Sequence, residues 1–383
     1  MPRILIFSNA AHVPTGYGEQ NRLLTGQLIC DGWETITRAN YGLRGAAITN
    51  NGGLTLPASY TKYGEDIMIA DIQTLKPDVS LLLFDIWVFP DDILEQKTLV
   101  GYVPIDHNPI SPLVAEKCKK VQHLWAMSRF ADRQMRSVGC DPWYAPHMTD
   151  TSIYKPVERT KARNELEYPD DWFVAVTVAA NKSYPSRKNL DKMFHAWSIF
   201  VQSHPKSVLY VHSQPRSING GFNLKSMARH FGIPEINISF ADTYKLASAQ
   251  YPPTTLNLEY NAADVYLQPS AGEGFGVPVI EAQAAGCPVI VSDWTAQSEL
   301  CGAGWLIPVS DDDRQYTLQG SFWANVPASK IVTALEKAHD ARGNDNLRKQ
   351  AREFAIQYDV SQVYKKYMKP SLDSIVEMNR SAA

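Results

Sequence analysis

The chain has 383 residues, of which 44% are hydrophobic and 20% are charged. This length exceeds what one ordinary hydrophobic core supports, so the sequence predicts two domains and excludes a fibrous or largely disordered protein. The formal net charge of −3 gives no overall attraction to nucleic acid, so binding of a polyanion would depend on a local patch.

The spacing of the cysteines and the length of the apolar runs indicate in which cellular compartment the protein is found. The five cysteines form no Cys-x-x-Cys pair, and their odd number and wide spacing do not suggest a disulfide framework or a zinc site. The apolar run at residues 3–7 is too short for a signal peptide, and no later run approaches the length that spans a bilayer. We therefore expect a soluble, cytoplasmic protein without a transmembrane segment.

In the first half, short apolar runs alternate with amphipathic stretches, which is typical of a parallel sheet covered by helices on both faces. The predicted strands are 4–7, 35–39, 79–84, 99–105 and 123–127. They indicate a first Rossmann-like domain over residues 1–168.

The second half repeats this pattern after a proline-rich stretch. Pro142, Pro146, Pro156 and Pro169 interrupt the chain, so we place the hinge here and expect a second Rossmann-like domain over residues 169–365. Its predicted strands are 172–179, 208–212, 236–240, 265–268, 288–291 and 305–307. The end of the chain reads as helical and broken near Pro370, with a last helix at 366–383 that we expect to cross back to the first domain. The predicted fold class is α/β, with two doubly wound domains facing a cleft.

The most informative motif follows the predicted strand 265–268. The sequence runs through a loop with glycines at 272, 274 and 276 into a helix that starts near Pro278. A glycine loop before a helix N-terminus presents unpaired N–H groups and a partial positive charge, which suits a diphosphate. Glu273 and Glu281 could help there only by accepting hydrogen bonds from sugar hydroxyls. Composition leaves open that they are an ordinary loop carboxylate and a helix acid.

The run Glu273-Gly-Phe-Gly-Val-Pro-Val-Ile-Glu281, with Ala-Gly-Cys-Pro-Val-Ile shortly after it, resembles a known signature. It is similar to that of the retaining glycosyltransferases with two Rossmann-like domains (GT-B fold, glycosyl transferases group 1), the family of sucrose synthase and bacterial mannosyltransferases. The resemblance implies that Glu281 binds the ribose of a nucleotide and that Glu273 binds hydroxyls of the transferred sugar. It also implies that the backbone amides of Phe275, Gly276 and Val277 contact sugar or phosphate.

A second segment, Ser-Arg-Lys-Asn at 186–189, resembles the basic site with which this family clamps the diphosphate. The resemblance assigns that role to Arg187 and Lys188, whose charges would stabilise the departing nucleotide. The arginine that the family carries nearer the strand is replaced here by Ala180 and Asn181. Either Arg187 substitutes for it or that contact is missing.

A third segment, residues 294–299, resembles the loop of the family that lies near the nucleotide phosphates. Its sequence is equally that of an ordinary helix start with Thr295 or Ser298 as the cap. Both interpretations remain open from the sequence.

In the first half, Pro-Thr-Gly-Tyr-Gly at 14–18 resembles the family's glycine loop, which implies that Gly16 and Gly18 lie near the donor phosphates. A plain turn is the alternative. After the predicted strand 99–105, Asp106 and His107 stand where family members carry a catalytic-centre residue, and either could hold that place. An Asp that caps a helix or turn is the alternative for Asp106.

The resemblance implies transfer of a hexose from a nucleoside-diphosphate sugar to an acceptor hydroxyl, with retention of anomeric configuration. No metal and no cofactor beyond the sugar nucleotide would be required, and UDP-glucose is the default donor. A sugar-nucleotide-binding protein without activity and a nucleotide-sugar epimerase remain alternatives.

The resemblance implies that the first domain binds the acceptor and the second domain binds the nucleotide sugar. The acceptor is open: a glycan, a lipid phosphate or a hydroxymethylated base in DNA. A base in duplex DNA would have to be flipped out of the stack. A basic stretch could bind an anionic acceptor, or could be the solvated face of surface helices. Its cations are Lys117, Lys119, Lys120, Arg129, Arg133 and Arg136.

Overall fold

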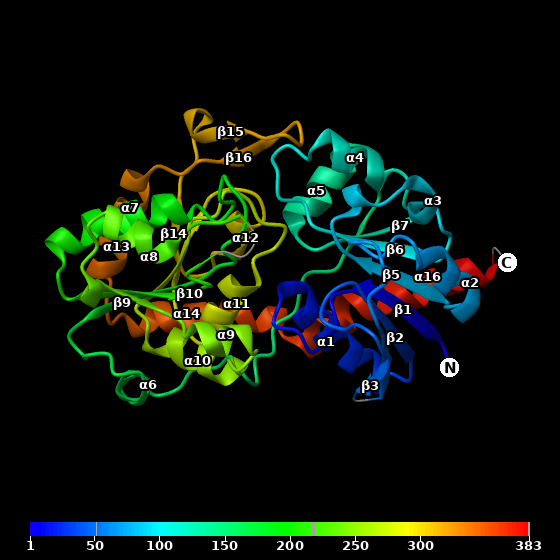
Figure 1. Cartoon of the computed structure of the whole chain (residues 1–383), viewed down its shortest axis with the longest axis horizontal. Coiled ribbons are helices and arrows are strands. Elements are labelled where there is room, and N and C mark those ends of the chain that lie inside the picture. Colours follow the sequence, from blue (N-terminus) through cyan, green and yellow to red (C-terminus); the bar gives the residue numbers. More distant parts are fainter. Residues whose placement is uncertain (51, 217–219, 382–383) are drawn as a thin grey trace. The chain divides into compact units, whose positions relative to one another are not determined.

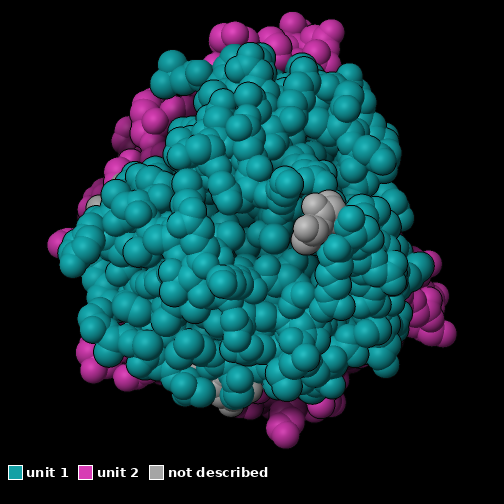
Figure 2. Space-filling view, turned by 90° about the vertical axis from the view of Figure 1, so that its right-hand side faces the viewer, with its two compact units in different colours: residues 1–149, 318–321, 358–383 teal, residues 150–317, 322–357 magenta. Residues whose placement is uncertain are grey.

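The computed structural model describes residues 1–50, 52–216 and 220–381 (Figure 1). They form two compact units. The first unit holds residues 1–149, 318–321 and 358–383, and the second holds residues 150–317 and 322–357. Figure 2 shows the surface of the first unit in teal. Within the described residues, every helix is too short or too polar to span a lipid bilayer.

The first unit is built on an eight-stranded sheet with the order β3-β4-β2-β1-β5-β6-β7-β8. All neighbouring strands are parallel except β3 and β4, which pair antiparallel. The strands are β1 (Arg3–Ser8), β2 (Glu34–Ala39), β3 (Ile48–Asn50), β4 (Gly53–Leu56), β5 (Val79–Leu83), β6 (Leu99–Val103), β7 (His123–Ala126) and β8 (Trp143–Tyr144). Strands β5 and β6 are buried along their whole length, as expected for central strands covered on both faces.

Helices flank this sheet (Figure 1). They are α1 (Gly16–Cys30), α2 (Met68–Leu75), η1 (Ile86–Val88), α3 (Asp91–Leu94), α4 (Pro112–Cys118), α5 (Arg129–Ser137), α15 (Val360–Val363), η5 (Tyr364–Met368) and α16 (Lys369–Ser381). Their apolar faces and the sheet share one core, to which Leu5, Leu82 and Val103 belong.

The second unit has a six-stranded, fully parallel sheet with the order β11-β10-β9-β12-β13-β14. Its strands are β9 (Phe173–Val178), β10 (Ser207–His212), β11 (Ile238–Phe240), β12 (Val265–Gln268), β13 (Val289–Ser292) and β14 (Gly304–Ile307), with a separate hairpin of β15 (Arg314–Tyr316) and β16 (Phe322–Ala324). The predicted α/β class with two parallel, doubly wound sheets is confirmed.

The helices of the second unit enclose a separate core around Phe194, Trp197 and Leu335. They are α6 (Arg159–Glu165), α7 (Leu190–Ser203), α8 (Leu224–His230), η2 (Glu235–Asn237), α9 (Thr243–Ala247), α10 (Pro253–Ala262), α11 (Val277–Ala284), α12 (Gln297–Leu300), η3 (Asp311–Asp313), α13 (Ala328–Asp340) and α14 (Asp345–Ala355). A short helix, η4 (Ile356–Tyr358), lies where the chain passes for the last time from the second unit to the first.

The boundary that we expected between residues 168 and 169 lies between 149 and 150 instead. Residues 150–168 belong to the second unit because buried polar side chains bind them there. Asn257 and Asn261 accept hydrogen bonds from the main chain at residues 155 and 157, with lengths of 3.0 and 2.8 Å. Arg163 donates to the carbonyl of Ala262 at 3.0 Å and pairs with Asp264 at 2.9 Å. The prolines correctly indicated that this segment is irregular. Its hydrogen bonds, however, determine that it is part of the second unit.

The C-terminal segment belongs to the first unit from residue 358, not from 366. It is helical from Val360 to Ser381, through a π-helical turn that ends just before α16. Pro370 is the second residue of α16 and directly follows this π-helical turn. Asp31 accepts a hydrogen bond from Tyr364 at 3.0 Å and pairs with Lys369, and Arg380 pairs with Asp78 at 3.0 Å.

Candidate functional site

The loop between β12 and α11 is the centre of the candidate site. Gly276 precedes α11 with φ of +118°, a conformation that side chains with a Cβ rarely adopt. Pro278 lies in the first turn of α11, where its lack of an N–H has no cost. The loop and α11 are buried except for Val277 and Pro278, which are half-buried. The sequence thus fixes a rigid turn in front of the N-terminus of α11.

Glu273 lies in this loop and is held by two cations that precede α7. Its Oε2 is 2.7 Å from Arg187 Nη1, and its Oε1 is 2.5 Å from Lys188 Nζ. Only 7% of the Glu273 side chain is exposed. Burial opposes ionisation, but the charges of Arg187 and Lys188 outweigh it and lower the pKa of Glu273 from 4.5 to about 2. These three residues form an ion triad with a net charge of +1.

Main-chain hydrogen bonds fix the triad in place. Arg187 Nη1 also donates to the carbonyl of Gly272 at 2.6 Å, and the carbonyl of Arg187 accepts from Ala271 N at 2.7 Å. The Asn189 side chain donates to the carbonyl of Pro269 at 2.8 Å. Two segments about 85 residues apart are thereby locked together at the carboxyl end of β12.

Glu281 lies on the second turn of α11 and is 6% exposed. Tyr260, on α10, donates a hydrogen bond to Glu281 Oε2 at 3.2 Å. Burial raises the pKa of Tyr260, so its hydroxyl keeps its proton and remains a donor. The structure therefore places both predicted carboxylates on the same loop and helix, each with a defined partner.

Thr295 ties the segment 294–299 to this loop. Its Oγ1 accepts a hydrogen bond from Glu273 N at 3.0 Å, and its backbone has φ of +54°. Helix α12 begins at Gln297 without a side-chain cap, so the interpretation of Thr295 or Ser298 as a helix cap is wrong. The hydroxyl of Thr295 instead positions the backbone of Glu273.

Asn181 stands near the place of the family's additional arginine and has a structural role. Its side chain accepts from Phe222 N at 2.9 Å and donates to the carbonyls of Phe222 and Gln214 at 2.7 and 3.0 Å. The Asn181 side chain thus connects the loop that follows β9 to the segment around residue 222 through hydrogen bonds. The guanidinium that reaches the glycine loop is that of Arg187.

In the first unit, the glycine-loop residues open helix α1. Thr15 caps this helix, because its Oγ1 accepts from Gly18 N at 3.1 Å. A Cβ on Gly18 would lie 2.4 Å from the carbonyl oxygen of Val13, so only glycine fits there. A Cβ on Gly16 would meet no atom within 4 Å. The segment 14–18 is thus a helix start rather than a plain turn, and it is open at Gly16.

Asp106 and His107 follow β6 in the same unit. Asp106 Oδ1 is 2.7 Å from His107 Nδ1, and His107 is 1% exposed. The next helix, α4, is capped by Ser111, so the helix-cap interpretation of Asp106 is wrong. The pair lies beyond the carboxyl end of a parallel strand, where ligands of such sheets bind.

Half of the six cations in the basic stretch of the first unit pair with carboxylates. Lys117 pairs with Asp91 at 2.7 Å and Lys120 with Glu95 at 3.1 Å. Arg136 pairs with Asp132 and Asp141, and the Arg129 guanidinium lies 3.5 Å from the ring centre of Tyr144. These ion pairs compensate part of the positive charge of the stretch, whereas the contact of Arg129 with Tyr144 leaves its charge in place, so both interpretations of the stretch stay open.

Comparison with solved structures defines the fold. Sucrose-phosphate synthase from Thermosynechococcus elongatus matches over 100% of both chains with a TM-score of 0.75 and 16% sequence identity. A glycosyltransferase from Rickettsia africae matches over 98% of each chain with a TM-score of 0.70 and 12% identity. The chain therefore has the GT-B fold of glycosyltransferases.

A family model matches part of the second unit. Residues 175–317, which include the triad and Glu281, match the family model of glycosyl transferases group 1. This match covers less than half of the chain and agrees with the resemblance that the sequence motifs indicate.

Curated relatives match over part of their length. Glycosyltransferase 335 of Sulfolobus islandicus rod-shaped virus 1, itself uncharacterized, is 24% identical over 221 residues, which are 56% of this chain and 61% of that relative. D-inositol 3-phosphate glycosyltransferase from Rhodococcus jostii is 29% identical over 169 residues, which are 43% of this chain and 35% of that relative. The chain thus spans about three fifths or less of these relatives.

Proposed function

We propose that this protein transfers a hexose from a nucleoside-diphosphate sugar to an acceptor hydroxyl, with retention of anomeric configuration and without a metal ion. The observation that carries the proposal is the ion triad of the buried Glu273 with Arg187 and Lys188 beside the N-terminus of α11. A binding site for a sugar diphosphate needs positive charge for the phosphates and acceptors for the hydroxyls, and this cluster supplies both.

The electrostatics of the cluster support a diphosphate ligand. Glu273 alone would repel phosphate, but two cations outnumber it and leave a net charge of +1. The N-terminus of α11 adds a partial positive charge and backbone N–H groups around Phe275, Gly276 and Val277. Such fixed charges stabilise the negative charge that grows on the departing nucleotide.

The remaining roles in the second unit follow from chemistry and family resemblance. Glu273 accepts hydrogen bonds from hydroxyls of the transferred sugar, and Glu281 accepts from the ribose. In the first unit, Asp106 with His107 stabilises positive charge at the anomeric carbon, and the helix start at Gly16 and Gly18 serves the donor phosphates. The leaving phosphate helps to deprotonate the acceptor.

UDP-glucose is the donor that we propose to test first. Anabaena HepE, which matches this chain with a TM-score of 0.67 and 15% identity, is described in complex with UDP-glucose. The pneumococcal GtfA, with a TM-score of 0.57, is described in complex with UDP and GlcNAc. These likenesses support a uridine nucleotide as the starting choice.

The donor site is tested by thermal unfolding with UDP, GDP, ADP and their sugars. A ligand that binds the folded state at about 100 times its Kd stabilises by about 2.7 kcal/mol. We expect one nucleotide series to raise the melting temperature, and Glu281→Ala to lose most of that shift. Glu353→Ala, a side chain that is 62% exposed on α14, is the matched control and should keep it. An equal shift in Glu281→Ala would refute the assigned site.

The reaction itself is tested with the donor so identified. Proton NMR of the product reports the anomeric configuration, and the same assay with a chelator tests metal independence. Retained configuration in the presence of chelator is the expected result. An inverted product or loss of transfer on chelation would contradict those two parts of the proposal. A binding protein would form no product, and an epimerase would release an altered sugar without an acceptor.

A further inference from the structure

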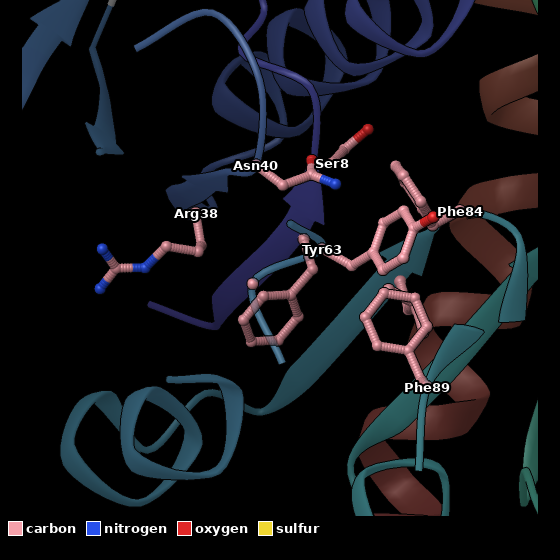
Figure 3. A pocket seen from close by; sticks show the side chains of 9 residues that line it. Ser8, Arg38, Asn40, Tyr63, Phe84 and Phe89 are labelled. Atoms are coloured by element: carbon pink, nitrogen blue, oxygen red, sulfur yellow. The ribbon is translucent and has the colours of Figure 1, made fainter. Parts of the chain in front are cut away.

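Two small hollows, one in each unit, differ in the charge that surrounds them. The hollow of the first unit is lined by Arg38, Asn40 and Phe84, and the guanidinium of Arg38 points away from the aromatic rings (Figure 3). Arg38 binds both oxygens of Asp71 at 2.6 Å, so this pair is neutral. The hollow of the second unit is surrounded by an excess of positive charge instead.

This second hollow lies at the amino ends of β12 and β13. Asp264 and Pro288, which line it, directly precede these two strands. The glycine loop of the candidate site follows the opposite end of β12, a strand of four residues, so the hollow is separated from that loop by roughly 13 Å. It has room for about one water-sized group, which excludes an organic ligand.

Four arginine side chains converge on Asp264 beside this hollow. Arg163 Nη2 is 2.9 Å from Asp264 Oδ2, and Arg159 pairs with Asp264 Oδ1. Arg342 Nε lies 3.9 Å from the same Oδ1 atom. Arg348 donates at 3.0 Å to the carbonyl of the residue that precedes Asp264. The four guanidiniums thus come from three segments of the second unit.

The positive charge of this cluster exceeds its negative charge. Main-chain carbonyl groups accept hydrogen bonds from three of the four guanidiniums, but a neutral carbonyl does not cancel a charge. Asp345 adds a second carboxylate, whose charge attracts Arg348, so the net charge is +2. The C-terminus of α13 and the N-terminus of α14 both border the hollow, so their opposite partial charges offset one another. The guanidiniums therefore determine the sign of the local field.

Arg159 has a buried donor that lacks an acceptor. Its Nε atom is buried and donates no hydrogen bond to any residue that the structure describes. A buried N–H without an acceptor is costly, so this atom fits a ligand that accepts a hydrogen bond. Burial lowers the pKa of Arg163 and of Arg348, and repulsion by the charge of Arg159 lowers both further. Water would satisfy the N–H group and leave the excess charge, whereas an anion satisfies both.

We propose that this hollow binds a small inorganic anion, either chloride or one oxygen of a phosphate group whose other oxygens remain in solvent. The anion accepts a hydrogen bond from Arg159 Nε and is attracted by the neighbouring guanidiniums. Arg159 lies on α6, Asp264 precedes β12 and Arg348 lies on α14. The bound anion therefore ties residues 150–168 to the rest of the second unit, and it stabilises this unit because it binds the folded state.

The test is chlorine NMR of potassium chloride with the full chain, in potassium gluconate at constant ionic strength. Chloride that exchanges with a protein site has a broadened line, which narrows as added chloride fills the site. Arg159→Gln should weaken chloride binding about 3- to 10-fold through loss of one charged donor. Asp264 keeps Arg163 as its partner in this variant, so the variant should fold. Potassium phosphate distinguishes the two anions, because it displaces chloride if phosphate fits and leaves the line unchanged if the site takes chloride alone.

A second variant, Asp345→Asn, has the opposite expectation. Asp345 is exposed and its charge opposes binding of an anion, so its removal should strengthen chloride binding about 2-fold. Lys161→Gln is the matched control, because Lys161 is an exposed cation on the same helix as Arg159, and it should bind chloride like the wild type. Anions held at other sites, the proposed donor site included, contribute equally to all four proteins and cancel in the comparison. The inference is overturned if Arg159→Gln broadens the line as the wild type does, since the hollow then holds water, or if Asp345→Asn binds chloride more weakly.

Discussion

Glu273→Gln removes the only negative charge of the triad and gives a quantitative test of its electrostatics. The pKa of Glu273 falls from 4.5 to about 2 in the folded protein, which corresponds to about 3 kcal/mol of stabilisation at neutral pH. The variant loses this contribution because Lys188 and Arg187, with 13% and 33% of their side chains exposed, are left without the carboxylate. We expect the second unit to be less stable by about 3 kcal/mol at pH 7.

The pH dependence of this difference identifies its cause. A lowered pKa stabilises the folded state above the ordinary value of 4.5, and the stabilisation is lost as the pH falls towards 2. Urea unfolding at pH 7 and pH 3, followed by tryptophan fluorescence, should therefore give a wild-type advantage that falls from about 3 to about 1 kcal/mol. Other carboxylates titrate in both proteins and cancel in the difference. A difference that stays constant between pH 7 and pH 3 would refute the reasoning.

Two further substitutions, with Gly16→Ala as a control for the second, test what holds each unit together. Asp264→Asn leaves the buried Arg163 guanidinium without its carboxylate and should cost about 3–5 kcal/mol in urea unfolding; a loss below about 1 kcal/mol would contradict the structural role of this pair. Gly18→Ala places a Cβ 2.4 Å from the carbonyl oxygen of Val13 and should cost about 1–3 kcal/mol, whereas Gly16→Ala has open space and should unfold like the wild type. Equal stability of the two glycine variants would show that the close approach at Gly18 is absent.

The buried strands could be predicted because their signal is local. An apolar run such as β12, with glycines after it and a proline at the next helix start, carries the strand, the turn and the helix in its own residues. The two site carboxylates could be located for the same reason, since both lie on this loop and helix. Chemistry that depends on local backbone geometry is visible in the sequence.

Edge strands and hairpins were missed. Strands β3 and β4 have only three and four residues with mixed polarity, and β8 has two. The Asn-Gly pair at 51–52 is a turn signal that could have indicated pairing of β3 with β4. The unit boundary was missed because it depends on side chains such as Asn257 and Arg163, whose partners lie about 100 residues away.

The sequence left a conflict at the centre of the site, since a carboxylate beside a diphosphate repels it. In the structure, ion pairs with two cations compensate the charge of the carboxylate, so the carboxylate need not lie far from the phosphate site. Glu273 bonds to two cations from a segment that no local pattern links to it, so the carboxylate is present while the cluster remains positive. Glu281 is satisfied differently, by the neutral hydroxyl of Tyr260. The ion triad therefore carries a net positive charge, and the carboxylate of Glu281, hydrogen-bonded to a neutral hydroxyl, keeps its own negative charge on the same loop and helix.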